Sequence, residues 1–443
     1  SHCEPNASPG STQMGNVGLS LPHLHECPLT DENQERLASL QRKEMMLRRC
    51  SVFVLLTAAL VIAPSVYGQG VVPNRSIVVL KQGAVPAKVA AVHGLAMDHV
   101  YSHALNGFAA VVPAGSLRKL KNDPSVALIE ADQAFTASAP PTVQQAAQLV
   151  PYGVLRIGAD TNPNFVSSPV IVDVAIIDTG IELSHPDLNV FKNVSCIRKI
   201  STGNDDNGHG THVAGTVGAL NNGVGVVGVA PGVRLWAVKV LDRNGSGWTS
   251  DVIKGVDYVT SNAASIEVAN MSLGGGNSAT LNMAIANSVA KGVVYVVAAG
   301  NSAANAGNDS PANSPNVLCV SAIVDTDGEC GGLGPATQYG ADDTFASFSN
   351  YGSVVNIAAP GVNIRSTYKG KTYATMSGTS MASPHVAGTV ALFLAGINKP
   401  ANAADVAAVR QFVISNSIPQ TDVCGFQGDG DGIQEPLVDA STP

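Results

Sequence analysis

Four long apolar runs restrict the fold of this chain more than any other feature of its sequence. They are VDVAIID, VRLWAVKVLD, IEVANMSL and VVYVVAAG, which begin at residues 172, 233, 266 and 293. Each is nearly continuous and bounded by Gly or Asp, as expected for strands that are buried on both faces of a sheet. Segments of helical periodicity, 250–258 and 279–290, lie between them. From about residue 150 onward, the pattern therefore predicts an α/β domain with a largely parallel sheet.

Composition agrees with a compact globular protein and excludes some classes of partner. The 443 residues suffice for two or three domains, and only 13% of them are charged. The net charge of −8 argues against nucleic acid as the natural partner. No apolar stretch is long enough to span a bilayer permanently, so we expect a protein without a stable membrane span.

The beginning of the chain carries the features of a secretory signal peptide at 45–68. Two arginines precede an apolar core, 52–63, and small residues precede a cleavage site after Gly68. The alternative is a buried core helix, but charge, core and cleavage site in this order favour secretion to the extracellular space. Translation is then expected to start at Met45 or Met46, with 1–44 an extension of the gene model. The mature protein would lack Cys3, Cys27 and Cys50.

Residues 69–135 predict a small domain with the order β-α-β-β-α-β. SIVVLK reads as the first strand, VYSHALNGFAAVVP as two strands joined at an Asn-Gly turn, and 126–131 as the last strand. This order is typical of a ferredoxin-like module, which alone could be any small α+β domain. A linker rich in Pro, Ala and Gln follows at 136–147, where we expect cleavage. Because the module precedes a chain that looks catalytic, a removable pro-domain is the favoured interpretation, with 148–443 as the catalytic domain.

Chemistry-bearing residues follow the apolar runs. Ser380 lies in GTSMASPHVAG, just before a predicted buried helix whose unpaired N–H groups would favour a developing negative charge. Asp178 ends the first run, His209 stands between two glycines in NGHGTHVAGTVGAL, and Asn301 follows the fourth run. Alone, Ser380 could be a helix cap and Asp178 a turn residue. Together, a serine, a histidine and an aspartate can form a nucleophilic triad, and an amide can stabilise an oxyanion.

Other histidines are interpreted as structural. His212 follows His209 by three positions, but the glutamate of a zinc-protease motif is missing between them. His185 and His385 are assigned the same structural role.

From Gln148 to about Ile397, the chain resembles the subtilisin-like serine proteases. VAIIDTGIELSHPDL, HGTHVAGT and GTSMASPHVAG are similar to the active-site signatures of that family and follow one another in its order. The resemblance implies that Ser380 is the nucleophile, His209 the general base and Asp178 its orienting partner. Asn301 and the Ser380 N–H would form the oxyanion hole. It also implies an N-terminal propeptide that inhibits the enzyme, aids its folding and is removed autocatalytically.

Alternatives from other classes are weaker. A non-catalytic relative could keep the fold and bind peptides, but the intact triad and Asn301 argue against it. A nucleotide-binding protein would need a GxGxxG or a Walker motif, which this chain lacks. The serine-carboxyl peptidases share the fold but carry acidic residues where this chain has His209. We therefore expect a secreted, monomeric serine endopeptidase that acts on polypeptides.

The family resemblance also implies how substrate binds. An extended polypeptide would add as a β-strand between two backbone segments, formed by Ser272, Leu273 and Gly274 on one side and by Gly245, Ser246 and Gly247 on the other. Asp309 aligns near the floor of the pocket for the residue before the cut, where a carboxylate would attract Lys or Arg. An equally good interpretation is that Asp309 is a solvated turn residue without a role in specificity.

Calcium is the cofactor that the resemblance implies, in a structural role. LNNGVGVVG is similar to the tight calcium loop of the family. Such a loop suits calcium because hard cations bind side-chain and backbone oxygens together. The expected ligands are the side chains of Gln148, Asp187 and Asn222 and the backbone oxygens of Leu220, Val224 and Val226. The second cation site of the family would involve Pro315, Val317 and Asn356, and the neutral Asn356 stands where relatives often carry aspartate.

Four cysteines remain in the expected mature chain, and their pairing stays open because four cysteines allow three pairings. They are Cys196, Cys319, Cys330 and Cys424. Cys330 lies in a segment, 325–344, that reads as an insertion.

Overall fold

The computed structural model describes residues 71–137, 142–144, 148–166 and 169–442. The predicted signal peptide and the segment ahead of it lie outside the described residues. Within the described ranges, no helix has both the length and the apolar content needed to cross a bilayer.

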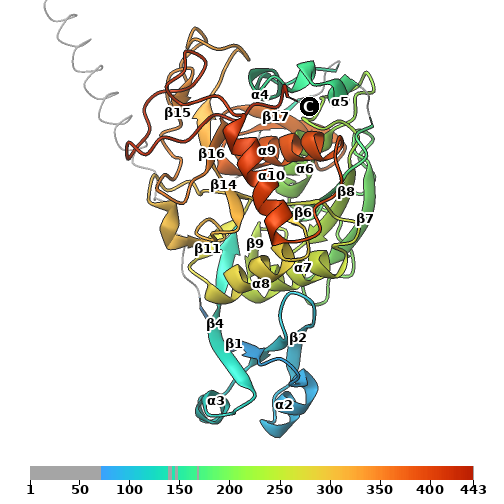
Figure 1. Cartoon of the computed structure of the whole chain (residues 1–443). Helices are drawn as coiled ribbons and strands as arrows, with labels where there is room; N and C mark the ends of the chain where they lie inside the picture. Colours follow the sequence, from blue (N-terminus) through green and yellow to red (C-terminus); the bar gives the residue numbers. More distant parts are fainter. Residues whose placement is uncertain (1–70, 138–141, 145–147, 167–168, 443) are drawn as a thin grey trace, which may run out of the picture. The chain divides into compact units, whose positions relative to one another are not determined.

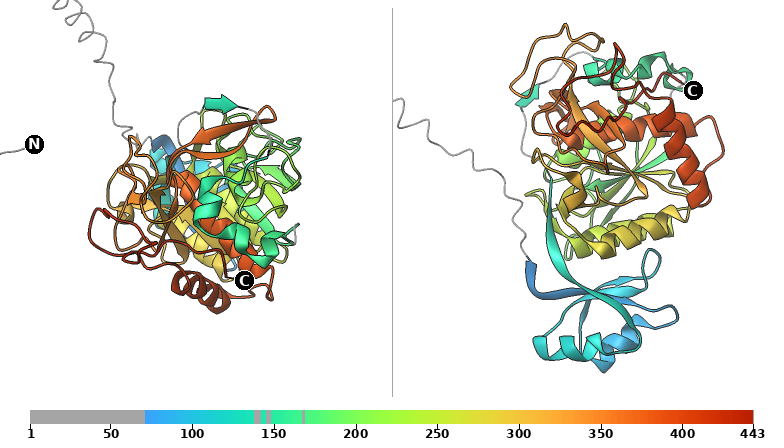
Figure 2. Two further views of the ribbon diagram at one scale, coloured as in Figure 1. Left: turned by 90° about the horizontal axis from the view of Figure 1, so that it is seen from above. Right: turned by 60° about the vertical axis from the view of Figure 1, so that its left-hand side comes forward.

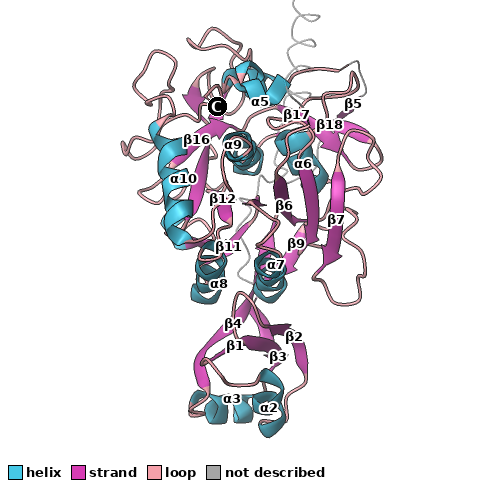
Figure 3. Ribbon diagram, turned by 45° about the vertical axis from the view of Figure 1, so that its right-hand side comes forward, coloured by secondary structure: helices cyan, strands magenta, loops and turns pink. Residues whose placement is uncertain are grey.

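The first part of the described chain has the order β-α-β-β-α-β, as the sequence predicts. Its strands pair antiparallel in the order β4-β1-β3-β2, and its two helices lie together on one side of this sheet (Figure 3). Its elements are β1 (Val71–Leu80), α2 (Pro86–Val92), β2 (Met97–Tyr101), β3 (Gly107–Val111), α3 (Ala114–Lys121) and β4 (Val126–Thr136).

Alternation along β1 gives this sheet two apolar faces. Val78 and Leu80 pack with Phe108 in a small core of their own, whereas Ile77 and Val79 belong to the large core of the rest of the chain. The second face is covered because helices that follow later in the chain contact β2 and β4. The module is therefore stabilised partly by the domain against which it packs.

The rest of the chain is built around a central sheet in the order β15-β14-β12-β10-β6-β8-β7, with β16 pairing beside β14. All its pairs are parallel except β14 with β15. The four predicted apolar runs are β6, β8, β10 and β12, and all their residues are buried except Arg234 at the start of β8. Every residue of β14 is buried as well. The strands are β6 (Asp173–Asp178), β7 (Val190–Ser195), β8 (Arg234–Lys239), β10 (Val268–Met271), β12 (Val294–Ala298), β14 (Val317–Val324), β15 (Thr344–Phe345) and β16 (Ile357–Pro360).

Helices cover both faces of the central sheet (Figures 1 and 3). Two of them, α6 and α9, pack on each other and on the middle strands, and α7 and α8 pack on each other on the opposite face. The helix α10 packs against α9. Their bounds are α6 (His209–Gly218), α7 (Thr249–Ser261), α8 (Ala279–Val289), α9 (Thr379–Leu394) and α10 (Ala403–Ser415). This arrangement confirms the predicted α/β class.

Shorter elements surround the central sheet. A three-stranded antiparallel sheet has the order β17-β18-β5, and β9, β11 and β13 join the sheet of the N-terminal module. Their bounds are β5 (Thr142–Gln144), β9 (Ser246–Trp248), β11 (Gly274–Gly276), β13 (Asp309–Ser310), β17 (Ile364–Tyr368) and β18 (Thr372–Met376). The remaining elements are α4 (Tyr152–Arg156), η1 (Ala159–Thr161), α5 (Pro163–Val166) and η2 (Ala306–Asn308).

Candidate active site

Asp178 and His209 meet at the carboxyl edge of the central sheet. Asp178 is the last residue of β6 and His209 the first of α6, and His209 Nδ1 lies 2.8 Å from Asp178 Oδ1. Neither side chain is exposed. The backbone N–H of Thr179 also donates to Asp178 Oδ1, at 2.6 Å. The carboxylate therefore fixes the orientation of the imidazole and favours the tautomer with the proton on Nδ1.

The electrostatics of this pair favour a charged imidazole. Burial alone lowers the pKa of His209, but the charge and hydrogen bond of Asp178, with a further contribution from Asp205, raise it above its ordinary value. His209 Nε2 is buried and has no hydrogen-bond partner among the described residues. The imidazole can therefore accept a proton at Nε2, and Asp178 can stabilise the resulting positive charge.

Glycines allow α6 to approach the end of β6. A Cβ atom at Gly210 would lie 2.1 Å from the carbonyl oxygen of Gly180 and 3.1 Å from Asp178 Cβ. Gly180 itself has a φ of 100°, in the left-handed region that favours glycine. The small residues noted around His209 are thus what places its ring beside Asp178.

Asp205, which the motifs did not single out, holds the N-terminal end of α6. Its buried carboxylate accepts hydrogen bonds from the N–H groups of Gly208 and Thr211 and from the hydroxyl of Thr179. Burial nevertheless raises its pKa. The only sequence signal was an acidic residue just before a predicted helix, a common capping pattern.

Ser380 occupies the first turn of α9, as predicted. Its Oγ donates to the carbonyl oxygen of Ser272 at 3.2 Å, and Ser272 Oγ donates to the carbonyl oxygen of Ser380 at 2.8 Å. Asn270 extends this buried network, because its Nδ2 donates to Ser272 Oγ and its Oδ1 accepts from Ser383 Oγ. The start of α9 is thereby fixed to the strand that precedes the predicted substrate-binding segment.

Asn301 is oriented by Thr379, a residue whose role sequence reasoning missed. The Thr379 N–H and hydroxyl donate to Asn301 Oδ1 at 2.8 and 2.9 Å. Thr379 Oγ1 in turn accepts from the N–H of Gly300 at 3.1 Å. Because Oδ1 is engaged on this side, the amide Nδ2 is directed elsewhere as a donor. The signal was Thr379 itself, next to Ser380 in the GTS motif.

One pocket brings together several of the predicted site residues. Leu273, Gly274, Asn301, Asp309 and Ser380 all line it. Asp309 is about half buried, and burial raises the pKa of its carboxyl group. It forms no ion pair with any described residue.

Comparison with known proteins identifies the family. The sequence profile of the subtilase family matches residues 171–435, more than half of the chain, and that of peptidase inhibitor I9 matches residues 77–138. The chain belongs to the subtilase family. Subtilases are serine endopeptidases that carry their chemistry on this fold, and the I9 match identifies the N-terminal module of this subtilase as a propeptide domain.

Characterised relatives agree with this assignment. Subtilisin NAT of Bacillus subtilis subsp. natto is 40% identical over 295 residues, which cover 66% of this chain and 71% of that protein. The alkaline protease of Alkalihalobacillus alcalophilus is 44% identical over 275 residues, which cover 62% of this chain and 65% of the relative. The crystal structure of a cold adapted subtilisin-like serine proteinase superposes with a TM-score of 0.53 and 34% identity, covering 66% of this chain and 98% of that structure.

The propeptide of this subtilase ends as a strand in the cleft. Strand β4 continues past the predicted end at residue 131 and lies antiparallel between β9 and β11 (Figure 2, right, cyan strand). Thr136 pairs with both Ser246 and Gly274, and the N–H of Ala137 donates to the carbonyl oxygen of Gly245 at 2.8 Å. The two backbone segments predicted to flank a substrate therefore flank the propeptide strand here.

Two propeptide acids sit at the N-terminal ends of catalytic-domain helices. Asp132 accepts from the N–H and hydroxyl of Ser250 at the start of α7, at 2.9 and 2.6 Å. Glu130 accepts in the same way from the N–H and hydroxyl of Thr280 at the start of α8. Both carboxylates accept from N–H groups that have no partner within their helix, and both lie at the positive end of a helix dipole.

Most of the predicted calcium ligands gather in one place. The side chain of Gln148 donates to the carbonyl oxygens of Leu220 and Val224 at 2.9 and 3.3 Å. Asn222 donates to Asp187 Oδ1 at 3.0 Å, and the N–H of Val226 to Asp187 Oδ2 at 3.2 Å. Burial raises the pKa of Asp187 to about 6. The carboxylate, carboxamide and carbonyl groups gathered here offer oxygen ligands, which fit a calcium ion better than a transition metal.

The residues of the expected second cation site are otherwise engaged. The carbonyl oxygen of Pro315 accepts from the guanidinium of Arg410 at 3.1 Å, and Asn356 Oδ1 accepts from the N–H of Cys319 at 2.9 Å. An arginine thus supplies positive charge at this position.

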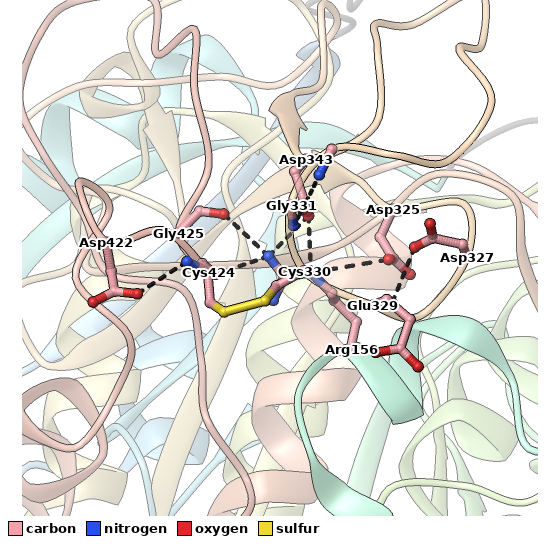
Figure 4. Close-up of a disulfide and its surroundings, with 11 residues drawn as sticks. Arg156, Asp325, Asp327, Glu329, Cys330, Gly331, Asp343, Asp422, Cys424 and Gly425 are labelled. Atoms are coloured by element: carbon pink, nitrogen blue, oxygen red, sulfur yellow. Dashed lines mark hydrogen bonds and ion pairs between the residues drawn. A yellow bond between two sulfur atoms is a disulfide. The ribbon is translucent and has the colours of Figure 1, made fainter.

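Cysteine pairing, which the sequence left open, is given by the structure. Cys330 and Cys424 form a disulfide that connects the insertion 325–344 to the C-terminal segment (Figure 4). Cys196 and Cys319 are buried and unpaired.

His212 behaves as the expected structural residue, because its Nε2 lies 3.0 and 3.1 Å from the carbonyl oxygens of Ile364 and Ala374. Burial lowers its pKa to about 3.

Proposed function

We propose that Ser380, His209 and Asp178 are the catalytic triad of this subtilase and that Asn301 completes its oxyanion hole. Ser380 Oγ attacks the scissile carbonyl carbon while His209 Nε2 takes the hydroxyl proton. Asn301 Nδ2 and the Ser380 N–H donate to the resulting oxyanion. His209 then returns the proton to the leaving amine, and an acyl-enzyme remains.

Deacylation repeats these steps with water. His209 removes a proton from a water molecule that attacks the acyl carbon, and the proton passes to Ser380 Oγ as the ester breaks. Asp178 keeps the imidazole oriented and stabilises its charged form throughout. The raised pKa of His209 agrees with this role.

One observation carries the proposal most strongly. A strand of the chain itself, β4, lies between β9 and β11 and leads toward the pocket that Asn301 and Ser380 line. An extended polypeptide thus occupies the position where a substrate would add as a strand. We infer that the propeptide inhibits the enzyme in this way and that the precursor cuts itself in the linker 136–147.

The test is the intact mass of the precursor and of its Ser380→Ala variant, both expressed from Met46 with calcium present. We expect the wild type to lose roughly its first hundred residues, the length from Met46 to the linker 136–147. The variant should keep them. The new N-terminus should lie in the linker. If both proteins fold and both stay at full length, the triad assignment is wrong and a peptide-binding role takes its place.

We further propose that Asp309 gives the enzyme a preference for Lys or Arg before the cut. A partly buried carboxylate without an ion-pair partner among the described residues would gain one from a basic side chain. On matched peptides, kcat/KM for Lys should exceed that for Leu, and Asp309→Asn should remove most of the difference. Equal cleavage of both peptides by the wild type contradicts this preference.

The Gln148, Asp187 and Asn222 group would hold a structural calcium ion. The ion would supply positive charge to the buried Asp187 carboxylate and connect the loop 220–226 to Gln148, so chelation is expected to destabilise the protein.

Secretion is also part of the proposal. Deleting 45–68 should retain the protein inside the cells that express it, whereas the intact precursor should deliver processed enzyme to the medium.

A further inference from the structure

Three aspartates gather in the insertion 325–344, outside the active site. Asp325 directly follows β14, Asp327 comes two residues later, and Asp342 lies near the end of the insertion. One carboxylate oxygen from each lies within 4.8 Å of the other two. Figure 4 shows the carboxylates of Asp325 and Asp327 beside each other.

One oxygen of this cluster lacks a partner. The Asp325 side chain is 0% exposed, and its Oδ2 has no hydrogen-bond partner among the described residues. Its other oxygen, Oδ1, accepts from the N–H of Gly328 at 3.1 Å. Burying a carboxylate oxygen without a donor is costly, so such an atom points to a ligand that the chain does not supply.

The nearest arginine does not neutralise the cluster. Arg156 Nε donates to Asp343 Oδ1 at 2.8 Å, and another nitrogen of its guanidinium donates to the carbonyl oxygen of Cys424 at 2.8 Å (Figure 4). The distance from Arg156 Nε to Asp325 Oδ1 is 4.0 Å. Arg156 is therefore hydrogen-bonded to Asp343 and forms a longer ion pair with Asp325, whereas Asp327 and Asp342 have no ion-pair partner among the described residues.

The cluster is held by hydrogen bonds and lies beside a cavity. The N–H groups of Thr326 and Gly334 each donate to one oxygen of Asp342 at 2.8 Å, which fixes that carboxylate. Asp325 and Thr326 also line a cavity of about 600 Å³. An ion would reach the cluster from this cavity, past Asp325 and Thr326.

We propose that Asp325, Asp327 and Asp342 form a cation site that binds Ca²⁺. Carboxylate oxygens suit a hard divalent cation, and the one cysteine of the insertion is engaged in the disulfide. The site shares no residue with the group around Asp187, which carries a single carboxylate, so it does not depend on the proposed function of that group. A bound ion would connect the two ends of the insertion, and the disulfide connects the same insertion to the C-terminal segment.

The test measures how many calcium ions the full precursor binds, by equilibrium dialysis of the Ser380→Ala protein, which cannot degrade itself. Asp327→Asn is the main variant, because Asp327 is only half buried and an asparagine can still accept from the N–H of Glu329. We expect Asp327→Asn to lower the affinity for one calcium ion by at least about tenfold. Glu329→Gln is the matched control: it removes the same charge from an exposed neighbour and should bind as the parent does.

Thermal unfolding with and without chelator separates binding from folding. In chelator, Asp327→Asn and Glu329→Gln should unfold at the same temperature as the parent, whereas only Asp327→Asn should lose part of the rise that calcium produces. Asp187→Asn should remove a different ion, and its effect should add to that of Asp327→Asn. The proposal is wrong if Asp327→Asn and Asp342→Asn both bind as many ions, equally tightly, as the parent. Binding of Mg²⁺ at the same affinity would overturn the assignment of calcium.

Discussion

Thr379 decides which end of the Asn301 carboxamide faces the cleft. Both of its donors engage Asn301 Oδ1, so the amide nitrogen faces away from Thr379, as its proposed role toward the oxyanion requires. Because the Thr379 N–H and hydroxyl already hold the carboxamide before substrate binds, Asn301 would not have to reorient during the reaction. The proposed oxyanion hole therefore depends on the segment that follows β12 and on the start of α9.

Removing the Asn301 amide should affect the chemical step and leave binding nearly unchanged. We expect Asn301→Ala to lower kcat by about 10²–10³-fold, the loss known for the equivalent donor in subtilisin, and to change KM little. Steady-state kinetics of the processed enzyme on a chromogenic peptide provide the measurement. A variant that loses activity only through a higher KM would show that Asn301 binds the ground state instead.

Glu435 makes stability depend on pH. Burial raises its pKa to about 7, and its Oε1 accepts from Ser321 Oγ at 2.8 Å. The folded protein therefore holds this proton more tightly than the unfolded chain does. Stability decreases as the pH rises from about 4.5 to 7, by roughly 3 kcal/mol in total.

Glu435→Gln should remove this dependence. Relative to its parent, the variant should gain stability across that pH range and keep the gain at higher pH, because a glutamine accepts from Ser321 without an ionisable proton. Urea unfolding of the Ser380→Ala protein at pH 4.5 and pH 7.5, with and without the change, provides the measurement. The same difference at both pH values would contradict a titrating Glu435.

Among the elements, β4 shows where sequence patterns reach their limit. The motifs placed Asp178, His209, Ser380 and Asn301 because each ends, begins or closely follows an element that local apolar periodicity reveals. The same periodicity ended β4 at residue 131, since Asp-Gln-Ala-Phe-Thr does not alternate in the usual way. The extension exists because β9 and β11, more than a hundred residues later, supply its partners. Thr379 and Asp205 escaped notice for the same reason.

Glu130 on β4 offers a test of how the propeptide is held. We expect Glu130→Ala to speed the release of the cleaved propeptide about fivefold, because losing a cap at a helix N-terminus costs about 1 kcal/mol. The lag before full activity appears in purified precursor gives the rate. Lys88→Ala, on the exposed surface of α2, should leave the lag unchanged. An unchanged lag in the Glu130 variant would mean that its contacts with Thr280 contribute nothing to retention.

At the scale of the whole molecule, the insertion 325–344 and the C-terminal segment form one unit. The disulfide joins residues 94 positions apart, and Arg156 of α4 contacts both segments through Asp343, Cys424 and Gly425. No local pattern could predict these contacts, because they join three distant parts of the chain. Sequence reasoning accordingly identified the insertion and its cysteine but not what they hold together.

Removing this disulfide should destabilise the catalytic domain and spare the active site. We expect Cys330→Ser with Cys424→Ser to lower the free energy of unfolding by about 2–4 kcal/mol, as for other disulfides that close long loops. Chemical unfolding in the Ser380→Ala background measures the loss. Activity of the double variant at low temperature should equal that of the wild type, and a large loss of kcat there would place the disulfide in the catalytic machinery.

The double membership of β4 links how fast the enzyme is made to how soon it works. The strand belongs both to the sheet of the propeptide and to the cleft of the catalytic domain. If the propeptide aids folding, as the family resemblance implies, and inhibits the enzyme as proposed, tighter pairing would help the catalytic domain to assemble and would also lengthen the time for which the finished enzyme stays blocked. Changes that strengthen or weaken β4 pairing would then be opposed from one side or the other, and faster maturation would come with less efficient assembly.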